Sequence, residues 1–149
     1  MKEYLSRINE VEFMKNVLSP FVGVDNISFG SERNKLREII ESDYKIIKRN
    51  EYAENTSDYY EELGFFVEYS KDNICEAIEY TNTSNLFYDG QNLFALKFSA
   101  LQNKYDSLSS NIELEDEIGV TYHDLGFGVS CEFGTDNIES IIVFSSSYW

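Results

Sequence analysis

Acid–base chemistry in this chain would depend on a single histidine, His123, among 27 acidic residues. His123 stands between Tyr122 and Asp124 at the entrance of a predicted strand. A histidine-based mechanism also needs a nucleophile or a second proton carrier, and no motif supplies one. We therefore predict that His123 is a hydrogen-bonded surface residue, and we predict no catalytic residue in this chain. The alternative is a small-molecule binding domain or an enzyme, with a pocket between sheet and helices that uses Tyr69, His123 or Tyr122.

Metal and cofactor sites have no support in the sequence. One histidine with Cys75 and Cys131, which lie 56 residues apart, does not make a zinc ligand set. The acidic run over residues 113–117 lacks the spacing and the glycine of a calcium loop, and no nucleotide-binding or serine-hydrolase motif occurs. We expect no metal and no cofactor. The two cysteines are predicted to be buried free thiols, with a disulfide as the alternative.

The remaining polar feature is a set of tyrosine and acidic residues just before two equivalent predicted strands. In a pseudo-symmetric fold the two groups could converge on one edge, where rings would anchor and carboxylates would steer a basic protein. For any single residue the alternative is a tyrosine packed in the core or a solvated carboxylate. The candidate partner-binding residues are Asp58, Tyr59, Tyr60, Glu61, Glu62, Glu113, Glu115, Asp116 and Glu117.

The elements that must position these residues form an internal repeat. Leu63-Gly64-Phe65 recurs as Leu125-Gly126-Phe127, and Asp72-Asn73-Ile74 recurs as Asp136-Asn137-Ile138. We read this as one structural unit used twice, over about residues 24–80 and 86–144. Glycine at the start of each hairpin strand indicates a backbone position that needs conformational freedom or close approach. Each unit is predicted to be strand, helix and β-hairpin.

The repeat predicts an α+β fold with a mostly antiparallel sheet and helices packed on it. Apolar residues at spacings of three and four add an N-terminal helix over 3–18, which Pro20 stops. The segments 48–59 and 109–119 are polar and are predicted to be loops. All 149 residues are expected to form one domain. The predicted hairpin strands cover residues 64–69, 74–80, 122–131 and 138–144.

Composition limits the partners that the chain can have. Its 27 acidic and 12 basic residues give a net charge of −15, which repels nucleic acid and anionic membranes and attracts basic proteins. The N-terminus carries no signal-peptide pattern. No apolar run approaches the roughly 18–20 residues that cross a membrane. We therefore expect a cytoplasmic protein that contacts neither nucleic acid nor membrane directly.

Three short motifs carry a family resemblance: Gly30-Ser31-Glu32, the run Asp89-Gly90-Gln91-Asn92-Leu93-Phe94, and the two Leu-Gly-Phe strands. Over roughly residues 21–144 the chain resembles small acidic immunity proteins of bacterial contact-dependent growth inhibition and polymorphic toxin systems. The resemblance implies a non-enzymatic inhibitor that binds a cognate toxin domain. It further implies that a nuclease toxin, such as an RNase of the EndoU type, would have its basic active site covered.

Overall fold

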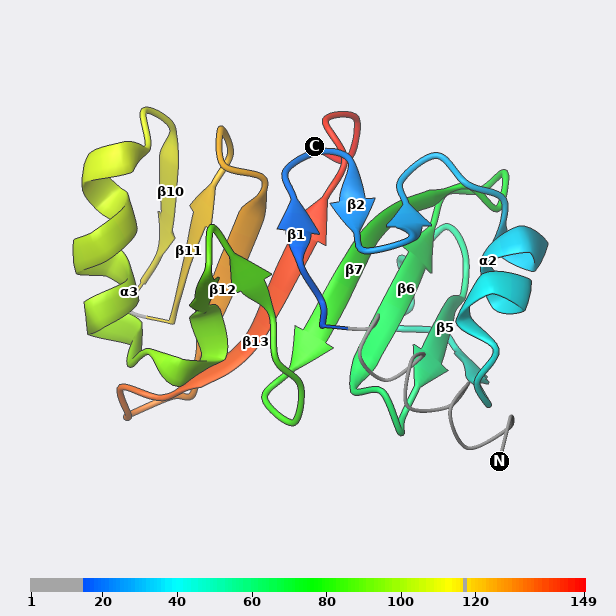
Figure 1. The fold of residues 1–149 in the computed structure, drawn as a ribbon, viewed down its shortest axis with the longest axis horizontal. Helices are drawn as coiled ribbons and strands as arrows, with labels where there is room; N and C mark the ends of the chain where they lie inside the picture. The colour runs from blue at the N-terminus through cyan, green and yellow to red at the C-terminus, as the bar shows by residue number, and fades with distance from the viewer. Residues whose placement is uncertain (1–14, 117) are drawn as a thin grey trace.

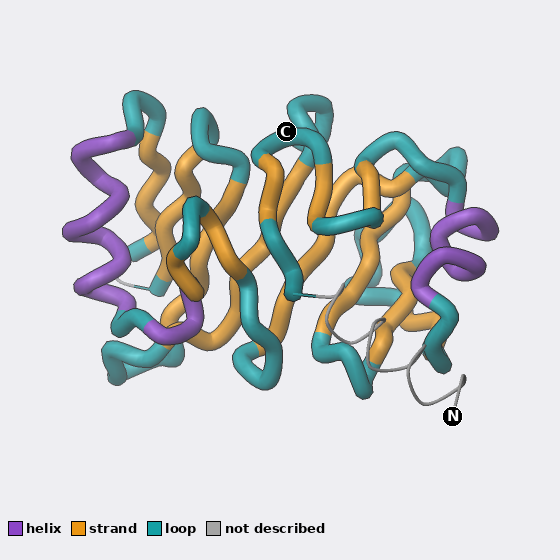
Figure 2. The backbone as a smooth tube through the Cα atoms, viewed as in Figure 1, coloured by secondary structure: helices purple, strands orange, loops and turns teal. Residues whose placement is uncertain are grey.

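A computed structural model describes residues 15–116 and 118–149. Within that part of the chain, strands predominate over two α-helices and two short 3-10 helices (Figures 1 and 2). The main sheet has eight antiparallel strands in the order β10-β11-β12-β13-β7-β6-β5-β4. Its strands are β4 (Lys45–Ile47), β5 (Ser57–Tyr60), β6 (Phe65–Tyr69), β7 (Cys75–Thr81), β10 (Ile112–Glu115), β11 (Gly119–Tyr122), β12 (Phe127–Cys131) and β13 (Ile138–Phe144).

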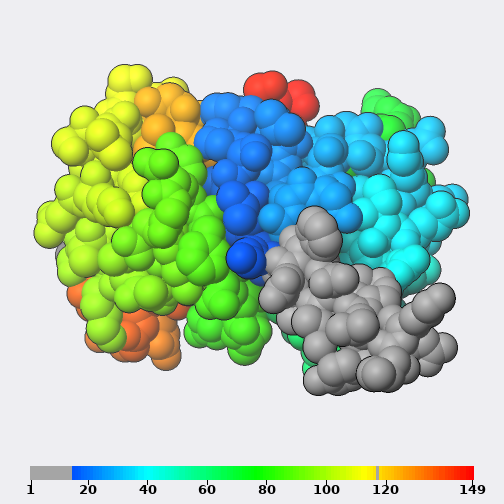
Figure 3. Space-filling model, viewed as in Figure 1, coloured from blue at the N-terminus to red at the C-terminus, as the bar shows by residue number. Residues whose placement is uncertain are grey.

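Short elements cover one face of this sheet (Figure 1). Helix α2 lies at one end of the layer and helix α3 at the other, with small strands between them. Figure 3 shows these segments closing over the sheet, with residues of the small strands in blue between α3 and α2. The covering elements are β1 (Leu18–Ser19), β2 (Gly23–Val24), β3 (Ile27–Ser28), α2 (Arg33–Ile40), β8 (Phe87–Tyr88), β9 (Gln91–Asn92), η1 (Leu93–Ala95), α3 (Phe98–Tyr105) and η2 (Asp106–Leu108).

The core lies between the sheet and this covering layer. Strand β6 shows why, because Phe65, Val67 and Tyr69 are buried while the alternate residues are only half-buried. Both helices contribute a narrow apolar stripe, with Leu36 and Ile40 on α2. On α3 the buried residues are Phe98, Leu101 and Tyr105.

The sheet consists of two four-stranded meanders that join where β13 pairs with β7. Each meander follows a helix, α2 before β4–β7 and α3 before β10–β13. The glycines of the two Leu-Gly-Phe motifs occupy matching turns: the N–H of Gly64 donates to Tyr60 O, and that of Gly126 donates to Tyr122 O. Both glycines have positive φ, +76° and +83°, which a residue with a Cβ rarely adopts.

The predicted α+β fold of two strand-helix-hairpin units is wrong, because strands dominate and each short helix is followed by four strands. The polar segments predicted as loops contain most of β5, all of β10 and the start of β11. A turn also divides the strand predicted over 122–131 into the end of β11 and the whole of β12.

Most of the N-terminal helix predicted over 3–18 lies outside the described residues. The end of that segment is extended rather than helical, since Val17 forms a bridge with Phe87 and Leu18 begins β1.

Candidate interaction site between α3 and β10

The structure separates the two groups of predicted partner-binding residues. Asp58, Tyr59 and Tyr60 lie on β5, next to one edge of the eight-stranded sheet, and Glu61 and Glu62 follow in the turn. The second group lies at the opposite edge. Glu113 and Glu115 belong to the edge strand β10, Asp116 follows it, and Glu117 lies outside the described residues. The expected convergence on one edge is therefore wrong, because five strands separate β10 from β5 in the sheet.

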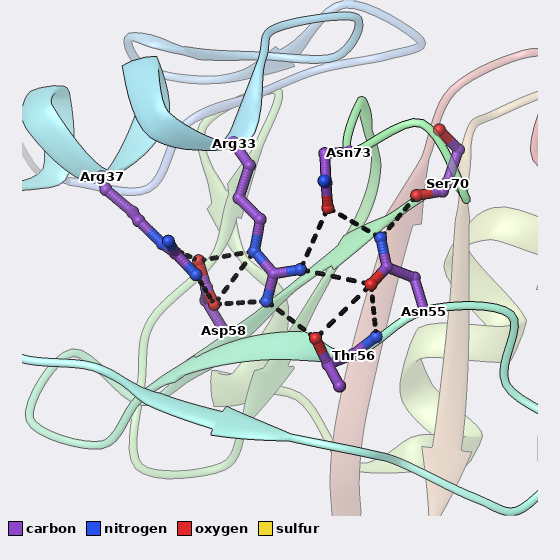
Figure 4. Close-up of polar contacts among 7 residues, drawn as sticks. All are labelled: Arg33, Arg37, Asn55, Thr56, Asp58, Ser70 and Asn73. Carbon is purple, nitrogen blue, oxygen red and sulfur yellow. Dashed lines mark hydrogen bonds and ion pairs between the residues drawn. The ribbon is translucent and has the colours of Figure 1, made fainter.

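Asp58 is fully buried and binds two arginines of α2 (Figure 4). Arg33 Nη2 donates to Asp58 Oδ1 at 2.6 Å, and Arg37 Nε donates to Oδ2 at 2.8 Å. Burial raises the pKa of Asp58, but the hydrogen bonds from Arg37 and Arg33 outweigh it, so the net pKa is lowered. Asp58 is thus an ionised part of the core and has no surface for a partner.

The rest of this network saturates Arg33 (Figure 4). Its Nη1 donates to Asn73 Oδ1 at 3.2 Å and to Asn55 Oδ1 at 3.4 Å, while Nη2 also donates to Thr56 Oγ1 at 3.1 Å. These bonds connect α2 to the segment before β5 and to the turn between β6 and β7. A guanidinium with all its donors engaged offers none to an anion, so the cluster stabilises the fold.

The other residues of the first group have mixed exposure. Tyr60 is fully buried. Tyr59 lies on the opposite face of β5 and stacks on Phe66 with ring centroids 4.2 Å apart. Glu61 and Glu62 are exposed, and Glu61 pairs with Lys45 at 2.9 Å. This edge therefore keeps few of the free carboxylates that the sequence suggested.

A groove of about 1110 Å³ opens between α3 and the end of β10. We call it the α3–β10 groove. Its helical wall is the first turn and a half of α3, and its opposite wall includes β10 and two turns of the sheet. The lining residues are Phe98, Ser99, Gln102, Leu114, Asp116, Ile118, Gly119, Cys131, Phe133, Gly134, Thr135 and Asp136.

Large apolar side chains of the groove stand in solvent. Leu114 is 65% exposed, Ile118 is 43% exposed and Phe133 is 89% exposed. Asp116 and Asp136 also line the groove, and the exposed Glu113 and Glu115 flank Leu114 on β10. An apolar patch with carboxylates beside it has the chemistry that suits a partner with both apolar and basic groups.

The same place in the other half of the sheet holds the arginine network and a smaller depression of about 340 Å³, which Arg33, Arg37 and Ile46 help to line. Tyr122 pairs with Phe127 as Tyr60 pairs with Phe65 in the repeated Leu-Gly-Phe motif. Two residues earlier on each strand, Val120 of β11 therefore corresponds to Asp58 of β5. Phe98 begins α3 as Arg33 begins α2. The ion pair of one half is thus replaced by apolar residues in the other, where the groove beside the helix is the larger of the two.

Asp136 fixes the helical wall of the groove. Its Oδ1 accepts from the Ser99 N–H at 2.8 Å, its Oδ2 accepts from the Ser99 hydroxyl at 2.6 Å, and its backbone oxygen accepts from the Phe98 N–H at 2.9 Å. The two bonds from Ser99 to the carboxylate lower the pKa of Asp136, the Ser99 hydroxyl being the main cause. The carboxylate therefore caps α3 and holds the turn before β13 against it.

The residues of the small-molecule alternative do not share a cavity. His123 Nε2 lies 3.1 Å from Glu113 Oε1, and its ring packs edge-on against Trp149. Tyr122 is fully buried and donates its hydroxyl to Asp106 at 2.6 Å. Tyr69 belongs to the other half of the sheet, where it borders a separate depression of about 210 Å³. Nothing in this arrangement forms a joint acid–base site.

Leu114, Ile118, Phe133 and Phe98 were absent from the residues predicted to bind a partner. A signal was available, since Ile112-Glu113-Leu114-Glu115 alternates apolar and acidic residues with the period of a strand. The high charge of this segment led to a loop prediction instead. Both cysteines are buried free thiols, as predicted.

Comparisons with protein-family models, with curated proteins and with solved structures found no match. Among the helices of residues 15–116 and 118–149, none has the length and apolar character that a membrane crossing requires.

Proposed function

We propose that this chain is a non-enzymatic binding protein that holds a basic protein partner in the α3–β10 groove. The observation that carries the proposal is the exposure of Leu114, Ile118 and Phe133 in a groove that Asp116 and Asp136 also line. Full burial of one such side chain contributes about 1.5–3 kcal/mol. Three neighbouring side chains therefore supply an anchor of the size that the central residues of protein interfaces provide.

The charge of the chain supports a basic partner. A net charge of −15 attracts cationic surfaces at long range, and the groove carries carboxylates where such a surface would arrive. Electrostatic attraction of this kind accelerates association, whereas apolar burial slows dissociation. The arrangement suits tight binding of one protein by another.

We further propose that the partner is a toxin domain and that the chain is its immunity protein in the bacterial cytoplasm. The support is the resemblance of the sequence motifs to acidic immunity proteins, together with the acidic groove. A nuclease domain, such as an RNase of the EndoU type, must be basic where it holds phosphates. A protein with an acidic, apolar docking groove can cover such a site and exclude the nucleic acid.

The test is co-expression with the C-terminal domain of the protein encoded immediately upstream, followed by co-purification and a growth assay. The wild-type chain should form a 1:1 complex and rescue growth. The double variant Leu114→Ser/Phe133→Ser should bind at least about a hundredfold more weakly, as expected for the loss of central anchors, and should not rescue.

The matched control is Ile46→Ser. Ile46 of β4 pairs with Asp58 of β5, just as Leu114 of β10 pairs with Val120 of β11. Ile46 is 60% exposed. This variant should bind and protect like the wild type. Equal binding by the groove variant and the wild type would place the interface elsewhere, and a toxic domain that the wild-type chain fails to bind would refute the immunity role.

A further inference from the structure

We infer that the partner docks by adding an extended strand to β10, with alternating apolar and basic side chains. The inference rests on the proposed function and specifies how the groove is used. Apolar side chains of the added strand would enter the α3–β10 groove, and its lysines or arginines would lie on the opposite face of the sheet, beside Glu113 and Glu115.

Within residues 15–116 and 118–149, no strand pairs with the outer edge of β10. Strand β10 is the outermost strand of the sheet at this end, and all four of its residues are exposed. The N–H of His123 donates to Asn111 O at 3.0 Å, one step beyond the Ile112–Tyr122 pair. Hydrogen-bonded and non-bonded pairs alternate in an antiparallel ladder. The backbone groups of Ile112 and Leu114 therefore point away from β11, toward the place of an added strand.

The two faces of β10 differ in chemistry. Leu114 pairs with the buried Val120, so it lies on the face that the groove borders. Glu113 and Glu115 pair with Thr121 and Gly119 and lie on the other face. Side chains of an added strand would meet the same two environments. Its residues must then alternate between apolar and basic.

The opposite edge of the sheet does not offer the same template. Strand β4 has only three residues, and Lys45 on it is already paired with Glu61. Short edge strands that carry lysine are a common protection against strand addition. Strand β10 is longer, carries no basic residue, and borders the larger groove.

Charge favours a foreign strand over a second copy of this chain. Antiparallel pairing of two β10 strands would set Glu113 and Glu115 of one copy beside those of the other on the same face. Like charges directly opposite each other destabilise a strand pair, and each copy carries a net charge of −15. A strand with lysine or arginine at these positions has the opposite, favourable interaction.

The test uses a fluorescent peptide of about eight residues that alternates Val and Lys, titrated with the full chain at physiological salt and followed by anisotropy. In the antiparallel pairing that extends this sheet, the Val amides face β10 and the Lys amides face solvent. N-methylation of the Val amides should weaken binding at least about tenfold, because each lost backbone bond costs a factor of roughly five. N-methylation of the Lys amides is the matched control and should leave binding unchanged.

The outcomes separate this inference from the proposed function. Equal binding of the two methylated peptides, with dependence on Leu114 and Phe133, would overturn strand addition and leave the groove as the docking site. Failure of the unmodified peptide to bind would also overturn strand addition, while the co-expression experiment still decides the proposed function. Concentration-dependent dimerisation that excludes the peptide would show that a second copy occupies the edge.

Discussion

Asp58 shows how burial decides the role of an acidic residue. An ionised carboxylate without solvent contact is tolerated only when its partners replace the lost water. Arg33 and Arg37 do so from one face of α2 at the spacing of one helical turn, i and i+4. The residue that the sequence suggested as a partner contact is therefore the point at which α2 is tied to the sheet.

Replacing Asp58 with Ala should lower the free energy of unfolding by about 3–5 kcal/mol, because two guanidinium groups lose their buried counter-charge. Urea denaturation measures the change. Glu61→Ala is the control, since Glu61 is in an exposed pair with Lys45 and should cost less than about 1 kcal/mol. Equal losses in the two variants would contradict a structural role for the buried network.

The same residue gives a pH dependence with a defined sign. The folded pKa of Asp58 is lowered, so its stabilisation is complete above the pKa of aspartate in the unfolded chain. It is lost as the pH falls through the lower folded pKa. The gap in unfolding free energy between wild type and Asp58→Asn should be constant near neutral pH and close in acid. A difference in unfolding free energy that grew in acid would contradict a lowered pKa for Asp58 in the folded protein.

Glu68 should behave in the opposite way. Burial raises its pKa, the Tyr148 hydroxyl lowers it, and Glu79 raises it further, with a raised pKa as the net result. The ionised form therefore costs stability at neutral pH. Glu68→Gln should raise the free energy of unfolding at neutral pH, and this gain should shrink in mild acid, where the wild-type carboxyl becomes protonated. Urea titrations at both pH values test it, and a loss of stability at neutral pH would contradict the argument.

At the scale of elements, strands with apolar residues recurring on one face were predictable, whereas the edge strand β10 and the polar strand β5 were not. The segments of β6, β7 and β13 matched predicted strands because apolar residues recur there on the side that meets the core. Strand β10 has no fully covered face, so Glu113 and Glu115 dominate its composition. Strand β10 is held in place by pairing with β11, and the local sequence pattern does not indicate this long-range pairing. The groove went unpredicted because it depends on where α3 stands relative to that edge.

The cap of α3 is an element-scale feature with a built-in control. Asp136→Ala removes the bonds to Ser99 and should lower the free energy of unfolding by about 0.5–2 kcal/mol. Asp72 stands at the equivalent place in the repeated Asp-Asn-Ile motif of the other half and is exposed. Asp72→Ala should therefore change stability by less than about 0.5 kcal/mol. Chemical denaturation of the two variants measures the difference, and equal effects would refute the capping role.

At the scale of the whole molecule, related halves have different contents at matching places. The half with α2 holds a buried charged network beside a small depression, and the half with α3 holds apolar residues around a larger groove. Both edge strands carry an exposed apolar residue, Ile46 on β4 and Leu114 on β10, and acidic residues lie at both edges. The two edges can therefore be compared in variants of identical total charge.

Two charge-reversal variants use this comparison. Glu113→Lys/Glu115→Lys and Glu61→Lys/Glu62→Lys change the net charge equally, so they share any loss of long-range attraction. The first pair should slow association with the proposed toxin partner about tenfold more than the second, because its charges lie on β10, where the partner is proposed to dock. Stopped-flow association rates measure this. Equal slowing would mean that total charge, and not the β10 edge, controls the encounter.

The pairing of β13 with β7, from Ser140 with Thr81 to Phe144 with Ala77, also has a consequence for synthesis. On a ribosome the strands of the first half emerge early, while β13 follows every other strand of the sheet. Until β13 is synthesised, β7 is an exposed edge strand that can pair with any compatible strand. Two nascent chains of a polysome that meet in this interval can exchange their second halves, which yields an intertwined dimer with all strand contacts preserved.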